Sequence, residues 1–272
     1  MDKLQRNERV SALIKILCDS PGKIFTLGYF AEMFGSAKST ISEDIDIAGN
    51  TLKRFELGNI ETIPGAAGGV RLMPFLGRGR VHEVLHSLCG ELSKSERILP
   101  GDYIYMLDII CDPERISKIA RIFAGHFFSQ GVDYVVTVET KGIPLAFETA
   151  KHLNVPLVIV RHYNEATDGS SVNINYVSGS SKKIQTMVLS LKALRRKSRL
   201  LFIDDFMKGG GTAKGILELA KEFDCEVAGI GVLIETARPQ KKLVDNYFSL
   251  LTLNEVNEAK DLIDIKPSIS WV

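Results

Sequence analysis

The stretch that decides the fold of most of the chain is residues 201–212, with the sequence LFIDDFMKGGGT. An apolar strand ends in two adjacent carboxylates, a glycine-rich loop with a lysine follows, and Thr212 opens the next helix. Glycines let backbone N–H groups approach a phosphate closely, and the amino end of a helix attracts negative charge. The two aspartates can accept hydrogen bonds from ribose hydroxyls or hold a magnesium ion. A simple Gly-rich turn is the alternative, but the shared register of these features favours a site for a phosphorylated sugar.

Predicted strands and helices alternate on both sides of this stretch. Helices are expected near residues 113–129, 143–153 and 211–223, and apolar runs predict strands at residues 103–110, 134–138, 157–161, 200–203 and 227–234. This alternation predicts an α/β fold with a mainly parallel sheet and helices on both faces. The acidic pair then lies at the carboxyl end of a strand, where open α/β sheets bind ligands.

Three segments depart from this alternating order. Residues 172–177 and 184–189, joined by residues 178–181, predict an inserted antiparallel hairpin. Residues 74–101 predict a helical connector. The apolar run at residues 244–256 is compatible with an edge strand.

The first part of the chain predicts three helices instead. The first ends at Pro21-Gly22, the second covers residues 27–34, and the third is capped by Ser39 or Thr40. The residues expected on the buried face of the third helix are Ile41, Ile45, Ala48, Leu52 and Phe55.

A two-stranded ribbon follows the third helix. Its strands are predicted at residues 60–63 and 70–73, with a glycine-rich loop between them. Helix, helix, turn, helix and ribbon is the order of a winged helix-turn-helix. We therefore expect two domains, at residues 1–73 and 74–272.

A winged helix-turn-helix binds duplex DNA by placing its third helix in the major groove. The residues expected to meet phosphates and base edges are Lys38, Ser39, Thr40, Ser42 and Lys53. Residues 1–73 contain nine Lys or Arg and nine Asp or Glu, so net charge does not favour DNA. A protein-interaction or dimerisation module is therefore the alternative for this domain.

The composition is that of an ordinary soluble protein. The 272 residues have a formal net charge of +1, and no apolar run approaches the roughly 20 residues of a membrane helix. The four cysteines lie far apart without CxxC spacing, which favours a reduced cytoplasmic compartment over disulfides or a zinc knuckle. HEVLH at residues 82–86 matches the zinc-protease pattern, but a third ligand is not evident. We expect a connector helix there and no metal site.

Residues 201–212 resemble the signature of type I phosphoribosyltransferases, enzymes that bind phosphoribosyl pyrophosphate. The resemblance implies that the aspartates contact the ribose and that the following loop holds the 5′-phosphate. A second loop, within residues 138–146, resembles the loop that grips pyrophosphate and that often contains a non-proline cis peptide in these enzymes. The implied ligand contacts are Thr140, Lys141, Gly142, Asp204, Asp205, Phe206, Met207, Lys208, Gly209, Gly210, Gly211 and Thr212.

Other residues bear on the same site. Arg161 resembles a basic position that meets pyrophosphate in some of these enzymes, with a surface arginine as an equal alternative. Tyr103 and Phe206 are candidates to cover a nucleobase-like group, with core positions as the alternative. Many active enzymes have a carboxylate or a small residue where this chain has Lys208, and a charged lysine cannot accept a proton from a base. The site is therefore expected to hold its ligand rather than to catalyse transfer.

Taken as a whole, the chain resembles the purine repressor family of Gram-positive bacteria, which joins these two domains. The resemblance is close at residues 37–44, 64–70, 175–181 and 204–208. It implies a homodimer that binds operator DNA and is not a transferase. It also implies that phosphoribosyl pyrophosphate, with Mg²⁺ as a possible companion, is an effector that lowers operator affinity. An active purine phosphoribosyltransferase and an RNA-binding attenuation regulator are the alternatives.

The expected ligand site has two phosphate-binding ends. Guanosine tetraphosphate also carries phosphates at both ends, and its purine could stack on Phe206 or Tyr103. We hypothesise that this nucleotide occupies the same pocket.

Overall fold

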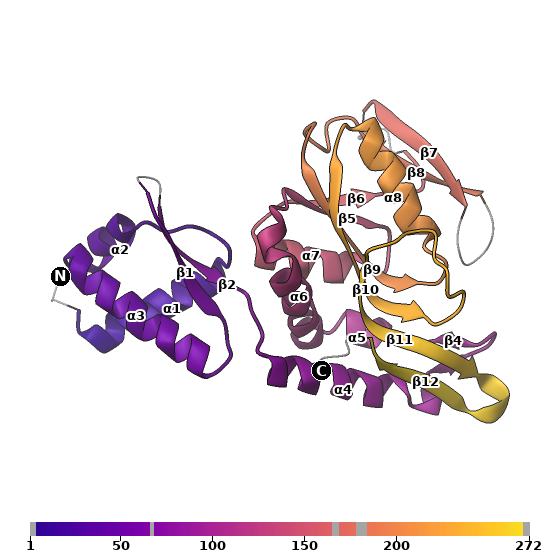
Figure 1. Cartoon of the computed structure of the whole chain (residues 1–272), viewed down its shortest axis with the longest axis horizontal. Coiled ribbons are helices and arrows are strands. Elements are labelled where there is room, and N and C mark those ends of the chain that lie inside the picture. The colour runs from indigo at the N-terminus through magenta and orange to yellow at the C-terminus, as the bar shows by residue number, and fades with distance from the viewer. Residues whose placement is uncertain (1–3, 66–67, 165–168, 178–183, 269–272) are drawn as a thin grey trace.

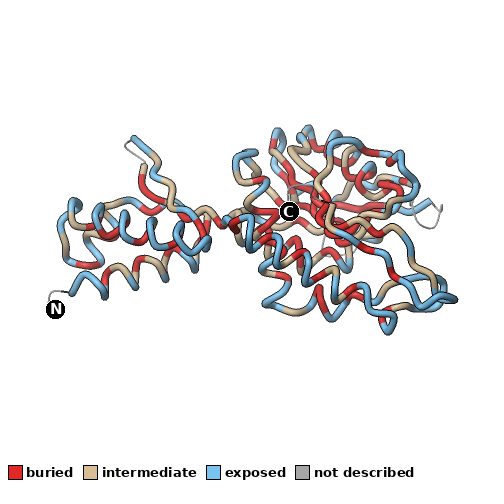
Figure 2. The backbone as a smooth tube through the Cα atoms, turned by 60° about the horizontal axis from the view of Figure 1, so that its bottom comes forward, coloured by how far each residue is buried: buried red, intermediate tan, exposed pale blue. Residues whose placement is uncertain are grey.

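The computed structural model describes residues 4–65, 68–164, 169–177 and 184–268, which form a smaller and a larger unit (Figure 1). The smaller unit contains three helices and a two-stranded ribbon, and the larger is built around a six-stranded sheet. Buried residues form separate cores in the two units (Figure 2). The smaller unit has one core, and the larger unit has one on each face of its sheet. Among the described residues, no helix is long and apolar enough to cross a membrane.

The smaller unit has the element order of a winged helix-turn-helix, as predicted. Its elements are α1 (Arg6–Asp19), α2 (Leu27–Phe34), α3 (Lys38–Arg54), β1 (Asn59–Ile63) and β2 (Gly69–Met73). The two strands pair antiparallel, and apolar residues from all three helices and β2 fill one core. The predicted wing loop includes residues 66–67, which lie outside the described part of the chain.

Two details of α3 differ from the prediction. Ser39 and Thr40 do not cap this helix, because α3 already begins at Lys38, after Ala37, which offers no side-chain cap. Four of the five residues predicted on its buried face are buried, but Phe55 is 55% exposed. The helix ends one residue before Phe55, so the helical spacing no longer turns this side chain inward.

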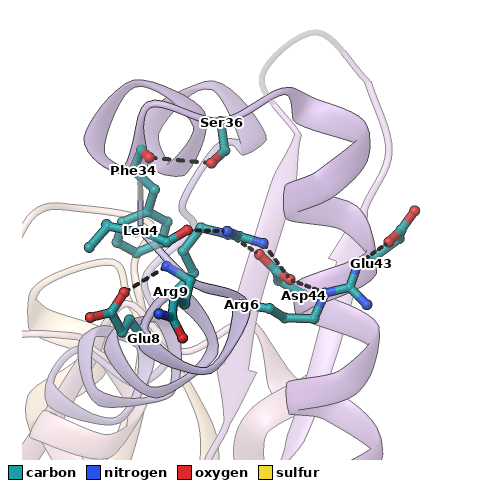
Figure 3. A network of polar contacts seen from close by, with 9 residues as sticks. Leu4, Arg6, Glu8, Arg9, Phe34, Ser36, Glu43 and Asp44 are labelled. Atoms are coloured by element: carbon teal, nitrogen blue, oxygen red, sulfur yellow. Dashed lines mark hydrogen bonds and ion pairs between the residues drawn. The ribbon is translucent and has the colours of Figure 1, made fainter. Parts of the chain in front are cut away.

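A buried ion pair joins α1 to α3 (Figure 3). Asp44 is fully buried, and its carboxylate accepts hydrogen bonds from Nε of Arg9 at 2.6 Å and from Nη2 at 3.3 Å. Nη1 of Arg9 donates to the carbonyl oxygen of Leu4 at 2.7 Å, and Nε of Arg6 lies 3.6 Å from the same carboxylate. The ion pair between Arg9 and Asp44 therefore fixes α3 against α1. The spacing of apolar residues in the sequence did not indicate this pair.

The larger unit has the predicted α/β fold with a mainly parallel sheet. Its parallel strands are β5 (Tyr134–Val138), β6 (Leu157–Val160), β9 (Arg199–Met207), β10 (Glu226–Thr236) and β11 (Phe248–Asn257). The strand β12 (Leu262–Pro267) pairs antiparallel with β11. The order across the sheet is β12-β11-β10-β9-β5-β6, so β9, with the acidic pair, lies in the interior of the sheet.

Helices cover both faces of this sheet, as predicted. One face packs against α4 (Arg78–Leu92), α5 (Leu107–Ile110), α6 (Pro113–Phe127) and α7 (Ile143–Leu153). The other face packs against α8 (Gly211–Glu222) and the predicted antiparallel hairpin of β7 (Ser171–Val177) and β8 (Ile184–Ser190). The residues that join β7 to β8 lie outside the described part of the chain. Short 3-10 turns occur at Ser95–Arg97, Phe128–Gln130 and Glu258–Lys260.

The predicted strand at residues 103–110 is wrong. Only Tyr103–Ile104 is assigned to a strand, β4, which pairs with β3 (Ile98–Leu99), and residues 107–110 form α5. The buried side chains in this segment are Met106, Ile109 and Ile110, and this spacing of three and four residues is helical. The apolar run therefore reflected a buried helical turn rather than an alternating strand.

The edge-strand prediction for residues 244–256 is also corrected. The strand in this run, β11, lies between β10 and β12, so β12 forms the edge. Along β12, buried Ile263 and Ile265 alternate with exposed Asp264 and Lys266. A short strand with charged side chains on one face is typical of a sheet edge.

The two units touch beside the segment that joins β2 to α4. The guanidinium of Arg121, on α6, donates to the carbonyl oxygens of Leu57 and Phe75. Nε of Arg80, on α4, donates to the carbonyl oxygen of Phe55 at 3.2 Å. These contacts attach the end of α3 and the ribbon to two helices of the larger unit.

Gly22, in the turn after α1, lies against the carboxyl end of α7. A Cβ atom on Gly22 would lie 2.9 Å from the carbonyl oxygen of Leu153 and 3.2 Å from Cβ of Asn154. Gly22 also has φ 74°, which side chains disfavour. The contact therefore requires a glycine both for space and for backbone conformation.

The buried pair predicts that Asp44→Ala destabilises the smaller unit by about 3–5 kcal/mol, because it leaves the buried guanidinium of Arg9 without its partner. Glu43→Ala is the matched control. It removes only the exposed partner of Arg6, so it should cost less than about 1 kcal/mol. Urea unfolding of the full chain measures both values, and equal losses in the two variants would contradict the role given to Asp44.

Candidate functional site

The glycine-rich loop connects the interior strand β9 to α8. β9 extends to Met207, further than predicted, so Asp204 and Asp205 lie within the strand rather than after it. The loop is Lys208–Gly210, and α8 begins at Gly211. Gly210 has φ 79° and ψ 15°, a left-handed conformation suited to glycine, and the first N–H groups of α8 follow directly.

The two aspartates line two adjoining cavities, because successive side chains of a strand point to opposite faces. Asp204 borders a small cavity of about 70 Å³, together with the glycine-rich loop and the start of α8. Asp205 borders a larger cavity of about 530 Å³. Phe206 and Lys208 border both cavities. The pair therefore lies between a small space beside the loop and a space large enough for a nucleotide-sized ligand.

The environment opposes ionisation of this pair. Burial, and then the negative charge of Asp205, raise the pKa of Asp204 well above its usual range. Burial also raises the pKa of Asp205, while its hydrogen bond with Asp204 and the positive charge of Lys141 act in the opposite direction. Two coupled carboxyl groups of this kind are stabilised in their charged form by hydroxyl donors or a cation.

The predicted pyrophosphate loop directly contacts the acidic pair. Gly142 has no room for a side chain, because a Cβ atom would lie 2.7 Å from Oγ1 of Thr137 and 3.0 Å from Oδ1 of Asp204. The peptide bond between Glu139 and Thr140 is cis. The helix α7 begins directly after Gly142, so its free N–H groups lie at this loop.

Most predicted ligand contacts gather at these two cavities. The larger cavity is bordered by Tyr103, Lys141, Asp205, Phe206 and Lys208, and the smaller by Asp204, Phe206, Met207, Lys208, Gly209, Gly210, Gly211 and Thr212. Thr140 is exposed and borders neither cavity within the described residues. Met207 borders the small cavity but also belongs to the buried core beneath α8.

Arg161 is not brought to this site. It borders a separate cavity of about 310 Å³ with Val188 and Leu189 of the hairpin. Its backbone exchanges two hydrogen bonds with Val188, at 3.1 and 2.8 Å, and this pairing holds Arg161 beside β8. Arg161 therefore borders neither of the two cavities described above, and its contact with pyrophosphate stays a prediction.

Sequence reasoning missed part of the larger cavity. Thr236 and Arg238 at the end of β10, and Asn254 and Glu255 in β11, also border it. Strand β10 was predicted, and ligands bind beyond the carboxyl ends of parallel strands. Thr236 and Arg238 could therefore have been proposed from the sequence as residues that border the site. The direction of β11 was not predicted, so its residues had none.

The exposed face of α3 carries the predicted DNA contacts. Lys38, Ser39, Ser42 and Lys53 are exposed, and Thr40 is half-buried. Lys38 and Lys53 lie about 22 Å apart along the helix axis, so they would meet different phosphates. Lys53 also borders a cavity of about 230 Å³ at the junction of the two units, beside Phe75.

The HEVLH motif forms part of α4, as expected for a connector helix. The rings of His82 and His86 stack with their centroids 4.0 Å apart, and both residues are exposed. Within the described ranges, no group of three or more His, Cys, Asp or Glu side chains could hold a metal ion.

Fold and site together define a class of protein in which a helix-turn-helix unit is joined to a unit with the phosphoribosyltransferase fold. Residues 5–74 match the family model described as bacterial purine repressor, N-terminal, and residues 107–263 match the phosphoribosyl transferase domain. The structure of adenine phosphoribosyltransferase from Rhodothermus marinus is similar to the larger unit, with a TM-score of 0.54 and 21% identity. That match covers 63% of this chain and 99% of the enzyme, and it concerns the fold alone.

The chain belongs to the bacterial purine repressor family. It is 46% identical over 264 residues to the purine biosynthesis transcriptional repressor PurR of Bacillus subtilis, covering 97% of this chain and 93% of the relative. It is 38% identical over 263 residues to a Lactococcus lactis protein named as a purine biosynthesis transcriptional activator, covering 97% of each chain.

The raised carboxyl pKa values predict how the stability of the larger unit depends on pH. An aspartate with a pKa above its ordinary value of about 3.9 binds more protons in the folded chain than in the unfolded chain. The resulting stabilisation is complete below that ordinary value and is lost as the pH rises through the raised pKa values, by at most about 1.4 kcal/mol per pH unit for each carboxyl. Asp204→Asn removes one of these groups, so it should flatten this decline.

Urea unfolding across the acidic and neutral range measures the slope. Asp264→Asn, at an exposed position on β12, is the matched control and should keep the wild-type slope. An Asp204→Asn variant with the wild-type slope would show that the buried pair is ionised as easily in the folded chain as in the unfolded chain.

Proposed function

We propose that this chain is a transcription repressor of purine biosynthesis genes that binds operator DNA and releases it when phosphoribosyl pyrophosphate binds the larger unit. The observation that carries the proposal is the convergence of the acidic pair, the glycine-rich loop and the Gly142 loop on adjoining cavities, in a chain of the purine repressor family. These groups match the ribose, the 5′-phosphate and the pyrophosphate of one ligand.

The chemistry of each part supports this assignment. The ribose hydroxyls would donate to Asp204 and Asp205, and so would stabilise the charged form that burial disfavours. The 5′-phosphate would accept from N–H groups of the loop and of α8, and the pyrophosphate would lie near Lys141 and the amino end of α7. Mg²⁺, if bound, would be held by one or two carboxylates together with ligand phosphates, and would neutralise phosphate charge.

Lys208 supports ligand sensing rather than transfer of the ribosyl group. It borders both cavities, and its charged ammonium can bind phosphate but cannot accept a proton from a nucleobase. The phosphoribosyltransferase fold would then serve to recognise the effector. Turnover of adenine, guanine, hypoxanthine or xanthine would identify an active transferase instead.

The proposed DNA-binding form is a homodimer in the cytoplasm. A two-fold dimer presents two α3 helices, so it would favour inverted half-sites on the DNA. Because the Lactococcus relative is named as an activator, transcription from the bound site should be measured together with binding.

The double variant Asp204→Ala, Asp205→Ala tests the effector site. It should lose the ribose contacts and weaken effector binding, while α3 is untouched. We expect a protein that still protects DNA upstream of purine biosynthesis genes, as wild type does, but no longer releases it when phosphoribosyl pyrophosphate and Mg²⁺ are added. Footprinting with and without effector measures this.

A matched control removes two carboxylates away from the site. Glu218→Ala with Glu222→Ala changes two exposed residues of α8, and this variant should release DNA as wild type does. Release of the Asp204, Asp205 variant at wild-type effector concentrations would show that the pair is not the ligand site.

We further propose that guanosine tetraphosphate occupies the same pocket. The larger cavity is bordered by Lys141, Lys208 and Arg238, and Tyr103 and Phe206 offer aromatic rings for a purine. A ligand shifts the equilibrium between the DNA-binding form and the released form only by the difference between its affinities for these two forms. The two ligands therefore need not have the same effect on DNA binding.

Competition calorimetry tests the shared pocket. Saturation with guanosine tetraphosphate should lower the apparent affinity for phosphoribosyl pyrophosphate in proportion to the nucleotide concentration. Binding of both ligands without mutual weakening, or no binding of the nucleotide, would contradict a shared pocket.

A further inference from the structure

Lys242 is a buried lysine behind the glycine-rich loop, in the segment that follows β10. It is 8% exposed, and its ammonium group donates to the carbonyl oxygens of Lys208 and Thr236, each at 2.6 Å. Oγ1 of Thr236 lies 3.4 Å away. Lys242 forms no ion pair with a carboxylate in the part of the chain that the structure describes, and its direct hydrogen-bond partners are neutral oxygens, although the negative charge of Glu235 also acts on it.

The next residue holds the loop from the same side. The N–H group of Leu243 donates to the carbonyl oxygen of Gly209 at 2.9 Å. Gly210 packs closely against this segment, because a Cβ atom would lie 3.3 Å from the nitrogen of Leu243. Two successive carbonyl groups of the loop, those of Lys208 and Gly209, therefore point toward Lys242 and Leu243.

This arrangement fixes the direction of two N–H groups. In a trans peptide, a carbonyl group and the following N–H group point in opposite directions. The N–H groups of Gly209 and Gly210 must therefore point away from the segment with Lys242. Both glycines are buried and border the small cavity, yet neither N–H group donates a hydrogen bond within the described residues. Both N–H groups are therefore free to donate to an acceptor in the small cavity, such as a phosphate oxygen.

Burial lowers the pKa of Lys242, and the negative charge of Glu235 acts in the opposite direction. Burying an ammonium group is costly, and the hydrogen bonds to the carbonyl oxygens of Lys208 and Thr236 offset part of that cost. An anion on the other side of the loop would stabilise the charge further, because opposite charges attract strongly in a water-poor environment.

We propose that Lys242 is the positioning residue of the phosphate loop. It aligns two successive peptide groups so that the N–H groups of Gly209 and Gly210 face the 5′-phosphate of a phosphorylated ribose, and its charge acts on that phosphate through the loop. Lys242 itself does not touch the ligand. The inference rests on the proposed effector site, whose other end, at the Gly142 loop, is independent of Lys242.

Calorimetry on the full chain with three ligands tests the proposal. Ribose 5-phosphate uses the glycine-rich loop, inorganic pyrophosphate uses the Gly142 loop, and phosphoribosyl pyrophosphate uses both. Lys242→Met should weaken ribose 5-phosphate and phosphoribosyl pyrophosphate by about tenfold or more, because hydrogen bonds to a charged group are lost. Pyrophosphate binding should stay within about twofold of wild type. Lys242→Arg, which keeps the charge, should recover part of the loss.

Lys241→Met is the matched control, because Lys241 is the adjacent lysine and is exposed. It should bind all three ligands as wild type does. Amide NMR of the wild-type chain gives a measurement that does not depend on how a variant folds. Ribose 5-phosphate should shift the amide proton signals of Gly209 and Gly210 downfield, and pyrophosphate should not.

The outcomes separate this inference from the proposed function. Failure of wild type to bind either phosphoribosyl ligand would overturn the effector site and the inference with it. Normal wild-type binding with unchanged ribose 5-phosphate affinity in Lys242→Met would overturn the inference alone. An equal loss for all three ligands in Lys242→Met, or unshifted Gly209 and Gly210 amides in wild type, would also overturn it.

Discussion

The candidate ligand site depends on one steric constraint, the absence of room for a side chain at Gly142. This residue lies between Thr137 and Asp204, with less than van der Waals distance available for a Cβ atom on either side. Because β5 and β9 are adjacent parallel strands, their carboxyl ends reach the same edge of the sheet. The close contact then sets the distance between the amino end of α7 and the acidic pair. Lys141, the residue before Gly142, borders the larger cavity together with Asp205, so this contact also bears on the lining of that cavity.

The sequence predicted the order of elements well because each signal was local. Helical spacing identified α1 to α3, and strand, acids and glycines in one register identified the loop before α8. Where apolar composition allowed either a helix or a strand, the spacing of the buried residues in the structure distinguishes the two. The segment after Tyr103 is apolar enough for a strand, yet its buried residues follow helical spacing. The edge strand β12 was missed because Asp264 and Lys266 interrupt its apolar residues.

The candidate site was predictable only in part, for a physical reason. Residues 204–212 are contiguous, so their joint role was visible in the sequence, and the Gly142 loop followed from resemblance. Long-range contacts leave no such pattern. Asn254 and Glu255 reach the larger cavity only because β11 lies beside β10, and Lys242 supports the loop from a segment with no motif of its own. The pairing of Arg161 with the hairpin was equally invisible in one sequence.

The helix α7 has a further consequence, which concerns how such a chain can evolve. Its amino end begins at Gly142, beside the acidic pair, and its carboxyl end lies against Gly22 of the smaller unit. Both ends therefore meet a glycine that leaves no space for a larger residue. A change in the length or tilt of this one helix would disturb the larger unit and the helix-turn-helix unit together. The two units must therefore evolve together. Replacing either unit by that of a distant homologue would require matching changes where the carboxyl end of α7 contacts Gly22.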